Sequence, residues 1–145
     1  MRIKPLRVDA ILPRYATDGS GCFDLFTPED VSWFYEDGFY TATIKTGWIF
    51  EIPDGHTLFG FSRSGHGFKA HTHLVNCVAV IDSDYRGEII IKLICLKHVP
   101  PQIKAGMAIA QAAIIETPKV FFEVTHDELS KTERGADGFG STTKS

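Results

Sequence analysis

The sequence predicts an all-β fold, a distorted jelly roll or β-sandwich. Valine, isoleucine, threonine and phenylalanine recur in short runs, and 13 glycines and 7 prolines separate these runs. No long segment repeats its apolar residues with the 3.6-residue period of a helix. Many short strands with frequent turn signals are typical of sandwiches and jelly rolls. A chain of 145 residues is long enough for one domain with a substantial core.

Nine strands follow from runs of branched and aromatic residues. They are expected, in chain order, at residues 2–8, 22–26, 39–45, 48–52, 56–61, 73–81, 88–97, 106–116 and 119–124. Asp37-Gly38 and Asp54-Gly55 mark tight turns between strands. Two places favour a helix: a turn or two that begins near Ser64, a good N-cap residue, and a single turn over residues 127–130.

The end of the chain differs in composition from the rest. Residues 131–145 contain no branched aliphatic side chain, and glycine, serine and threonine are frequent among them. We therefore expect a β core over residues 1–130 and a flexible, glycine-rich C-terminal arm over residues 131–145. Arg134 and Phe139 are not needed in a plain spacer, so a disordered end and a ligand-covering arm are both open interpretations.

Composition excludes several classes of function. The formal net charge of −3 argues against a nucleic-acid coat, because such a protein needs a broad basic surface. The apolar runs are too short to span a membrane, and the first residues do not predict a signal peptide. Cys22, Cys77 and Cys95 each stand in an apolar, strand-like setting. This odd set favours free thiols and a cytoplasmic protein, in the host cytoplasm if the chain is viral.

The most informative segment is a charged turn at residues 82–87, between two apolar runs. It holds two carboxylates, an aromatic ring, a guanidinium and a glycine: Asp82, Asp84, Tyr85, Arg86 and Gly87. A turn between two stiff strands fixes a carboxylate beside an aromatic face, which suits a bound sugar and a reactive water. Taken alone, a solvated hairpin turn is the more common interpretation of such a segment.

Other polar groups favour a phosphate ligand. Arg63, Ser64 and Gly65 follow a strand and precede the first expected helix, where free N–H groups and a guanidinium attract phosphate. Gln111 is a strongly polar residue in an apolar strand, so its amide either bonds the backbone or faces a ligand. Asp24 follows a glycine-rich loop and is able to point inward.

The C-terminal arm also carries groups that suit a nucleotide. Phe139 stands between two glycines, which allow the backbone to fold over a ligand while the ring covers a planar group. Arg134, Ser141 and Thr142 have the charge and the hydroxyls to hold phosphate oxygens.

Taken in order, these segments resemble the trimeric deoxyuridine triphosphatases (dUTP pyrophosphatases). The resemblance extends from about residue 16 to residue 142, with twelve residues from Ser64 to Asn76 and six from Asn76 to Asp82. It implies a jelly roll of the β-clip type that forms a homotrimer with shared active sites and an exchanged C-terminal arm. It also implies hydrolysis of dUTP to dUMP and diphosphate, which limits uracil in DNA and supplies dUMP for dTTP synthesis.

The resemblance assigns the chemistry to particular residues. Asp82 becomes the general base that orients water toward the α-phosphorus. Tyr85 packs on the deoxyribose and leaves no room for a 2′-hydroxyl, and Asn76 bonds the uracil edge. Gln111 and Arg134 complete the catalytic set.

Phosphate and metal binding follow from the same resemblance. The phosphate-binding motif consists of Arg63, Ser64 and Gly65, and the arm contributes Arg134, Phe139, Gly140, Ser141 and Thr142, with Phe139 over the uracil. The implied cofactor is Mg²⁺, held mainly by the triphosphate oxygens, and Asp24 contacts it through water.

Four positions depart from the family pattern. Ser62 replaces a usual proline and is expected to loosen the turn before Arg63 slightly. Ala79, Asp137 and Thr143 each replace a usual glycine. We expect these departures to change affinity and the motion of the arm rather than to abolish activity.

Two other functions stay open. A dCTP deaminase-like enzyme of the same fold resembles this chain around Arg63, but it lacks the turn at residues 82–87. A nucleotide-switched regulatory binding protein is the second alternative, which the intact motifs disfavour. His66, His71 and His73 are interpreted as surface or subunit-contact residues, with His71 and His73 on one strand face, in preference to a transition-metal site.

Overall fold

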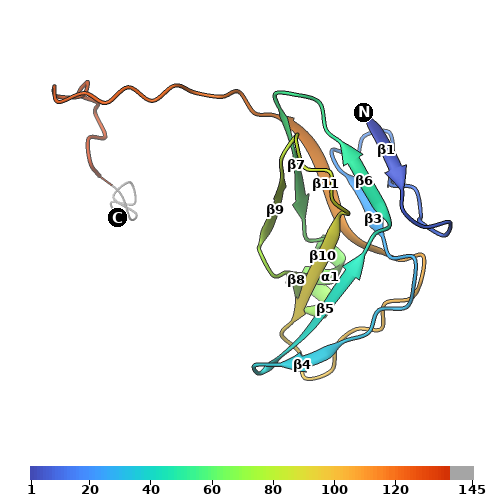
Figure 1. The fold of residues 1–145 in the computed structure, drawn as a ribbon. Coiled ribbons are helices and arrows are strands. Elements are labelled where there is room, and N and C mark those ends of the chain that lie inside the picture. Colours follow the sequence, from blue (N-terminus) through green and yellow to red (C-terminus); the bar gives the residue numbers. More distant parts are fainter. Residues whose placement is uncertain (138–145) are drawn as a thin grey trace.

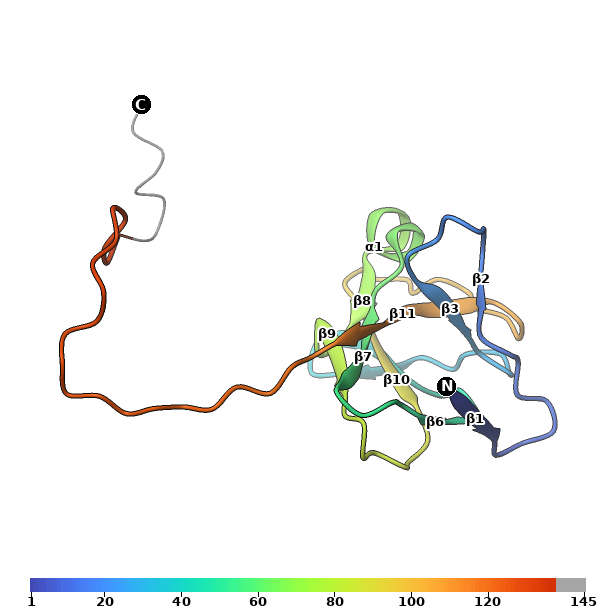
Figure 2. The same cartoon turned by 90° about the horizontal axis from the view of Figure 1, so that it is seen from above.

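The computed structural model describes residues 1–137, which form eleven strands and one short helix (Figures 1 and 2). The elements are β1 (Arg2–Pro5), β2 (Arg14–Tyr15), β3 (Phe23–Phe26), β4 (Phe34–Glu36), β5 (Phe39–Lys45), β6 (Trp48–Glu51), β7 (His56–Phe61), α1 (Ser64–Ala70), β8 (Thr72–Leu74), β9 (Val78–Ile81), β10 (Ile90–Cys95) and β11 (Ala108–Glu116). A five-stranded sheet has the order β2-β3-β11-β7-β9, and a four-stranded sheet has the order β4-β5-β10-β8. Strands β1 and β6 form a separate pair, and all of these pairings are antiparallel. The predicted all-β class is confirmed.

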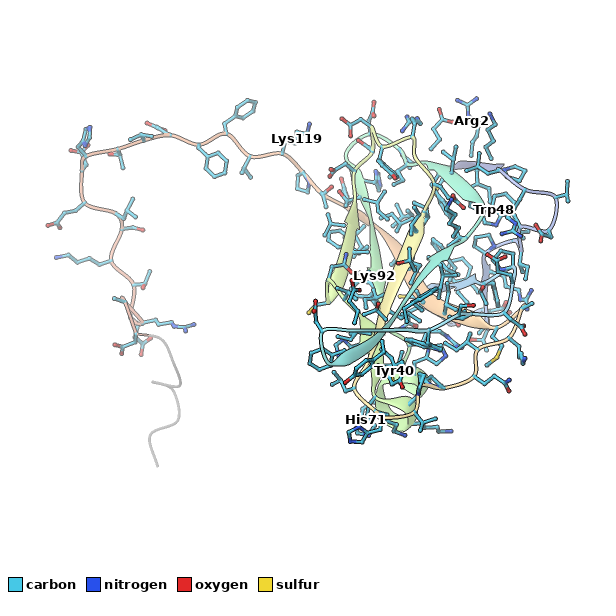
Figure 3. The ribbon with its side chains drawn as sticks, turned by 60° about the horizontal axis from the view of Figure 1, so that its bottom comes forward. Arg2, Tyr40, Trp48, His71, Lys92 and Lys119 are labelled. Atoms are coloured by element: carbon cyan, nitrogen blue, oxygen red, sulfur yellow. The ribbon has the colours of Figure 1, made fainter. Side chains whose placement is uncertain are left out.

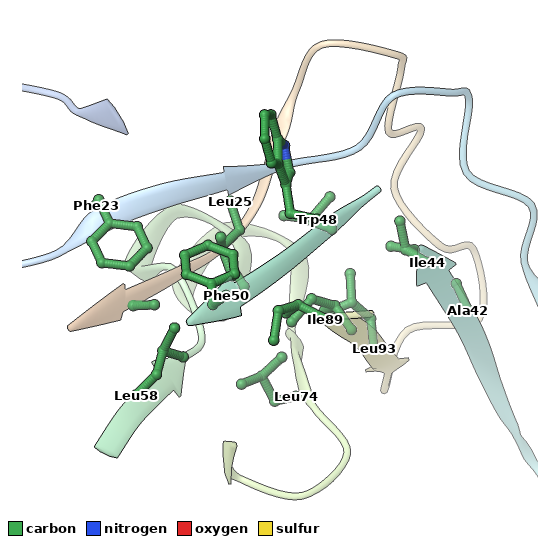
Figure 4. Packing of buried hydrophobic residues seen from close by; sticks show 14 of the residues in the cluster. Phe23, Leu25, Ala42, Ile44, Trp48, Phe50, Leu58, Leu74, Ile89 and Leu93 are labelled. Atoms are coloured by element: carbon green, nitrogen blue, oxygen red, sulfur yellow. The ribbon is translucent and has the colours of Figure 1, made fainter. Parts of the chain in front are cut away.

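Residues of both larger sheets and of β6 form one apolar core (Figure 4). Side chains alternate along the strands, so that Ile91 and Leu93 of β10 are buried while their neighbours face outward. The rings of Phe23 and Phe50 stack with centroids 6.2 Å apart. Leu58 of β7 is fully buried. Strand β7 is thus held by the core as well as by its neighbours β9 and β11.

The single strand expected at residues 73–81 is wrong, because the chain changes sheets within it. Strand β8 pairs with β10, and β9 pairs with β7 in the other sheet. Cys77 lies in the turn between them with φ of 60°, and its N–H donates to the Leu74 carbonyl at 3.1 Å. Cys77 is exposed, so the apolar setting expected for it is also wrong. Branched residues on both sides of the turn are typical of strands, so the sequence pattern did not reveal that β8 and β9 are separate.

The predictions for two short strands and for the segment after β11 also need correction. The short strands β2 and β4 were not predicted, and the strand expected at 119–124 and the helical turn expected at 127–130 do not form. Residues 118–137 are exposed and lead away from the body of the molecule, beginning beside Lys119 (Figures 1 and 3). A strand needs a neighbour to satisfy its backbone groups, and this segment meets none among residues 1–137. Within residues 1–137 we find no helix that is long and apolar enough to cross a membrane.

Helix α1 forms where a helix was expected, but its ends differ from the prediction. Arg63 is the N-cap residue and makes no side-chain capping bond, so Ser64 is the first helical residue rather than the cap. His71 ends the helix in the left-handed conformation with φ of 48°. His71 and His73 therefore do not share one strand face. His66 is half-buried, and its Nδ1 is buried without a hydrogen-bond partner.

We expect His66 to make stability depend on pH. Burial, and secondarily the nearby Arg63 guanidinium, lower the pKa of His66 from its ordinary value of 6.5. The unfolded chain therefore binds more protons than the folded chain once the pH falls below about 7, so stability decreases on acidification through this range. The urea midpoint should fall between about pH 7.5 and about pH 5.5, and His66→Leu should flatten this dependence.

His126, which is exposed, provides the matched control. His126→Leu should keep the wild-type pH dependence when protein concentration is held constant. The same loss of stability in wild type and His66→Leu would contradict the assignment.

Candidate active site

One cavity of about 380 Å³ lies beyond the C-terminal end of β7, beside the start of α1. Five of the predicted site residues line it: Asp24, Arg63, Ser64, Gly65 and Gln111. They come from β3, from the segment between β7 and α1, from the first turn of α1, and from β11. The fold thus brings together the predicted phosphate-binding residues, the predicted metal-side aspartate and the strand glutamine.

The guanidinium of Arg63 is held by two bonds. Its Nε donates to Asp24 Oδ1 at 3.0 Å, and its Nη1 donates to the Ala108 carbonyl at 3.1 Å. The register of β11 against β3 shifts between Ala108 and Ala110, as in a β-bulge. A bulge interrupts the ladder of backbone bonds, which allows the carbonyl to accept from a side chain. The arginine is therefore oriented by the protein before any ligand arrives.

Ser62 and Gln111 brace the same segment. Gln111 Nε2 donates to the Ser62 carbonyl at 3.0 Å, while Ser62 Oγ accepts from the Leu74 N–H at 2.9 Å. Gln111 therefore bonds the backbone and lines the cavity at once. The Ser62 hydroxyl thus adds a bond to β8 that the ring of a proline does not offer, which opposes the loosening expected at this turn.

A second cavity, of about 230 Å³, follows β9 and the charged turn after it. Asn76, Asp82 and Tyr85 all line this cavity. The Tyr85 N–H donates to the Asp82 carbonyl at 3.2 Å, which closes the turn. Arg86 Nη1 donates to the carbonyls of Ser83 and Tyr85 at 2.6 and 2.9 Å. The carboxylate and the aromatic ring thus share a hollow on a turn that its own arginine stiffens.

Arg63 and Asp82 lie toward opposite ends of β7. Phe61 pairs with Val78 of β9 and with Gln111 of β11, near the first cavity. Leu58 pairs with Ile81, and Asp82 follows Ile81 toward the other end. Phe61 follows Leu58 by three positions, which is about 10 Å along a strand, and Arg63 and Asp82 lie beyond opposite ends of this paired stretch. No side chain spans that distance, so Arg63 and Asp82 of one chain cannot hold the same phosphate.

One predicted residue of the arm, Arg134, lies in the described part of the chain. Arg134 is exposed on the segment that leads away from the body, and its Nε donates to the Asp137 carbonyl at 2.9 Å. It lines neither of these two cavities. The remaining arm residues, Phe139, Gly140, Ser141 and Thr142, lie outside the described residues.

Some lining residues were not predicted. Ser20, Gly21 and Cys22 line the first cavity, and the glycine-rich loop before Asp24 was the signal that pointed to them. Glu88 lines the second cavity. Its place directly after the charged turn was a possible signal, but a glutamate at the edge of a strand is usually solvated.

Comparisons with known proteins identify the family of the chain. The family model described as dUTPase matches residues 8–143. A deoxyuridine 5'-triphosphate nucleotidohydrolase from Nautilia profundicola is 43% identical over 145 residues, with 99% of both chains covered. Another from Hydrogenobaculum sp. is 41% identical over 140 residues, covering 97% of this chain and 95% of the other.

A solved structure shows the same fold. A mutant of the dUTPase of Staphylococcus bacteriophage 80alpha, with dUpNHpp, superposes with a TM-score of 0.79 at 24% identity, covering 97% of this chain and 96% of that one. The match of the family model and the near full-length relatives cover both cavities and the segment that follows them. The chain therefore belongs to the dUTPase family.

Proposed function

We propose that the chain is a dUTP pyrophosphatase, which hydrolyses dUTP to dUMP and diphosphate by attack of water on the α-phosphorus. The observation that carries this proposal is the second cavity, where a carboxylate and an aromatic ring face one hollow on a braced turn. Family membership supports the same substrate. In a cell this reaction would limit uracil in DNA and supply dUMP for dTTP synthesis.

The active unit in this proposal is a homotrimer with shared sites. The cavity with Asp82 needs a cationic phosphate site, and the cavity with Arg63 needs a nucleoside site, yet the two are too far apart in one chain. If the first cavity of one copy faces the second cavity of another copy, the two together form one complete nucleotide site. A cyclic arrangement repeats this contact at every subunit boundary.

Each residue has a distinct role in the completed site. Asp82 accepts the proton of the attacking water, Tyr85 packs on the deoxyribose, and Asn76 bonds the uracil edge. Arg63 of a neighbouring copy contacts the phosphates with Ser64 and Gly65. Because Asp24 and Ala108 already orient the guanidinium, little reorganisation accompanies the development of charge on the phosphates. Gln111 and Arg134 assist at the phosphate chain.

The donor set fits a magnesium ion that arrives with the nucleotide. In the described part of the chain, no three histidine, cysteine or acidic side chains are grouped to hold a metal. Asp24 is the acidic residue of the phosphate-side cavity, and Arg63 occupies one of its oxygens. Magnesium commonly keeps several waters and binds substrate phosphates, so Asp24 would contact it through water. When bound, the ion would neutralise part of the triphosphate charge.

The segment after β11 supports exchange between copies. Val120, Phe121, Phe122 and Val124 are between 68 and 102% exposed, an unfavourable state for apolar side chains in water. We infer that this stretch packs on a neighbouring copy, and that residues 131–145 form an arm that closes over the neighbour's site. Within that arm, Phe139 would cover the uracil, with Arg134, Gly140, Ser141 and Thr142 near the γ-phosphate.

The cellular setting follows from the thiols. Cys22, Cys77 and Cys95 are all free cysteines. We infer a reducing cytoplasm, either of the cell that encodes the chain or of a host.

Asp82→Asn should abolish turnover without preventing binding. The amide keeps the shape of the carboxylate but cannot accept the proton of the water, so kcat should fall by about 10²- to 10⁴-fold. Calorimetric titration with the non-hydrolysable analogue α,β-imido-dUTP should give a dissociation constant close to that of wild type. Asp84→Asn is the matched control and should retain activity. Near-normal turnover by Asp82→Asn would remove this residue from the role of base.

Shared sites can be tested by complementation. Arg63→Ala and Asp82→Asn should each be inactive alone, because each damages a different half of every site. When the two variants are unfolded and refolded together at equal amounts, up to about a quarter of the sites should receive both intact halves, if halves come from different copies of a cyclic assembly. No recovered activity, with mixed assemblies shown by mass spectrometry, would contradict sharing.

Deletion of residues 132–145 should separate folding from activity. The truncated chain should keep its oligomeric state in analytical ultracentrifugation, since the core and the apolar stretch at 120–124 remain. Its kcat for dUTP should fall by about 100-fold or more, because the closing arm excludes bulk water and holds the phosphates. Wild-type kinetics after truncation would show that the arm is no lid.

A further inference from the structure

The Tyr85 ring, which lines the second cavity, contacts two residues that the proposed reaction does not use. We propose that Gly87 and Glu88 are positioning residues that hold the Tyr85 ring and thereby set the rejection of ribonucleotides. This inference rests on the proposed function, since it assigns the specificity of the same site.

Gly87 is required by space rather than by backbone conformation. It is not among the described glycines with positive φ, so its dihedral angles do not demand glycine. A Cβ added there would clash with Oη and Cζ of Tyr85 and would lie 2.9 Å from Cε2. The tyrosine ring thus folds over the bare Cα of Gly87. Because these atoms are the far end of a side chain, a methyl group at residue 87 would displace the ring while the backbone stays in place.

Glu88 holds the hydroxyl end of the same ring. The Tyr85 hydroxyl donates to the Glu88 carbonyl at 3.2 Å, and Glu88 Oε1 accepts from the Gly47 N–H at 2.8 Å. The next residue, Ile89, is buried, and its N–H donates to the Trp48 carbonyl at 2.9 Å. The carboxylate therefore ties the segment under Tyr85 to the turn between β5 and β6.

That turn is itself a rigid anchor. Gly47 has φ of 78°, and a Cβ there would come within 2.8 Å of Arg7 Cγ and 2.9 Å of Ala10 Cβ. Its carbonyl accepts from the Leu6 N–H at 2.8 Å. Gly47 is buried under the N-terminal segment, so its N–H presents a fixed point to Glu88.

A held ring discriminates between sugars, whereas a movable ring does not. Tyr85 is 44% exposed, so no surrounding core keeps it in place. Deoxyribose fits beside the Tyr85 ring, but a 2′-hydroxyl group would need the space that the ring occupies. If the ring can recede, the ribonucleotide enters, and the loss falls on selectivity more than on hydrolysis of dUTP.

The experiment compares kcat/KM for dUTP and for UTP in the full-length protein. Gly87→Ala and Glu88→Ala should each lower the ratio of the two constants by about tenfold or more, mainly by raising the constant for UTP. Glu88→Gln keeps an oxygen that accepts from Gly47 and should retain the wild-type ratio. Gly19→Ala is the matched control, because a Cβ at Gly19 meets open space.

The outcomes separate the inference from the proposed function. An unchanged ratio in Gly87→Ala and Glu88→Ala overturns the inference, whether the rates for both nucleotides stay normal or fall together. If Glu88→Gln does not retain the wild-type ratio of kcat/KM for dUTP and UTP, Glu88 is not a positioning residue. A wild-type protein that does not hydrolyse dUTP overturns the proposed function and this inference together.

Discussion

The antiparallel pairing of β7 with β9 on one side and β11 on the other is the constraint on which the site depends. It places the cationic group around Arg63 at one end of β7 and the carboxylate and ring of Asp82 and Tyr85 at the other. Because the separation is several times the length of a hydrogen bond, the proposed function treats each chain as the source of two half-sites. Association of copies is therefore part of the proposed chemistry.

Each half-site is held by bonds that do not involve a ligand. On the phosphate side, Arg63 is bound by Asp24 and by the carbonyl at the β-bulge of β11. On the nucleoside side, Tyr85 lies over Gly87 and bonds the Glu88 carbonyl. Side chains that are positioned in advance lose less freedom on binding, so more of the interaction energy remains for the transition state. The segment after residue 117 contrasts with both, since it lies exposed in the single chain.

Prediction from sequence succeeded where local patterns carry the information. Runs of branched residues located most strands, and the residue types and spacing of Arg63, Asn76 and Asp82 indicated the family to which the chain belongs. It failed where a partner strand decides the outcome. The apolar run at 73–81 divides between two sheets at Cys77, and residues 119–124 have strand composition but no neighbouring strand in the described part of the chain. The bond from the Leu74 N–H to the Ser62 hydroxyl was not predicted either, because it joins residues twelve positions apart.

The sequence by itself determined the all-β class, the identity of the chemical groups and their order along the chain. These features depend on side-chain type and on neighbours a few residues away, so the information is local in the sequence. Tertiary structure alone decided which groups meet: Arg63 with Asp24 and Ala108, Glu88 with Gly47, and Asp82 far from Arg63. Strand register sets those distances, and it arises from pairing across tens of residues that no local pattern encodes.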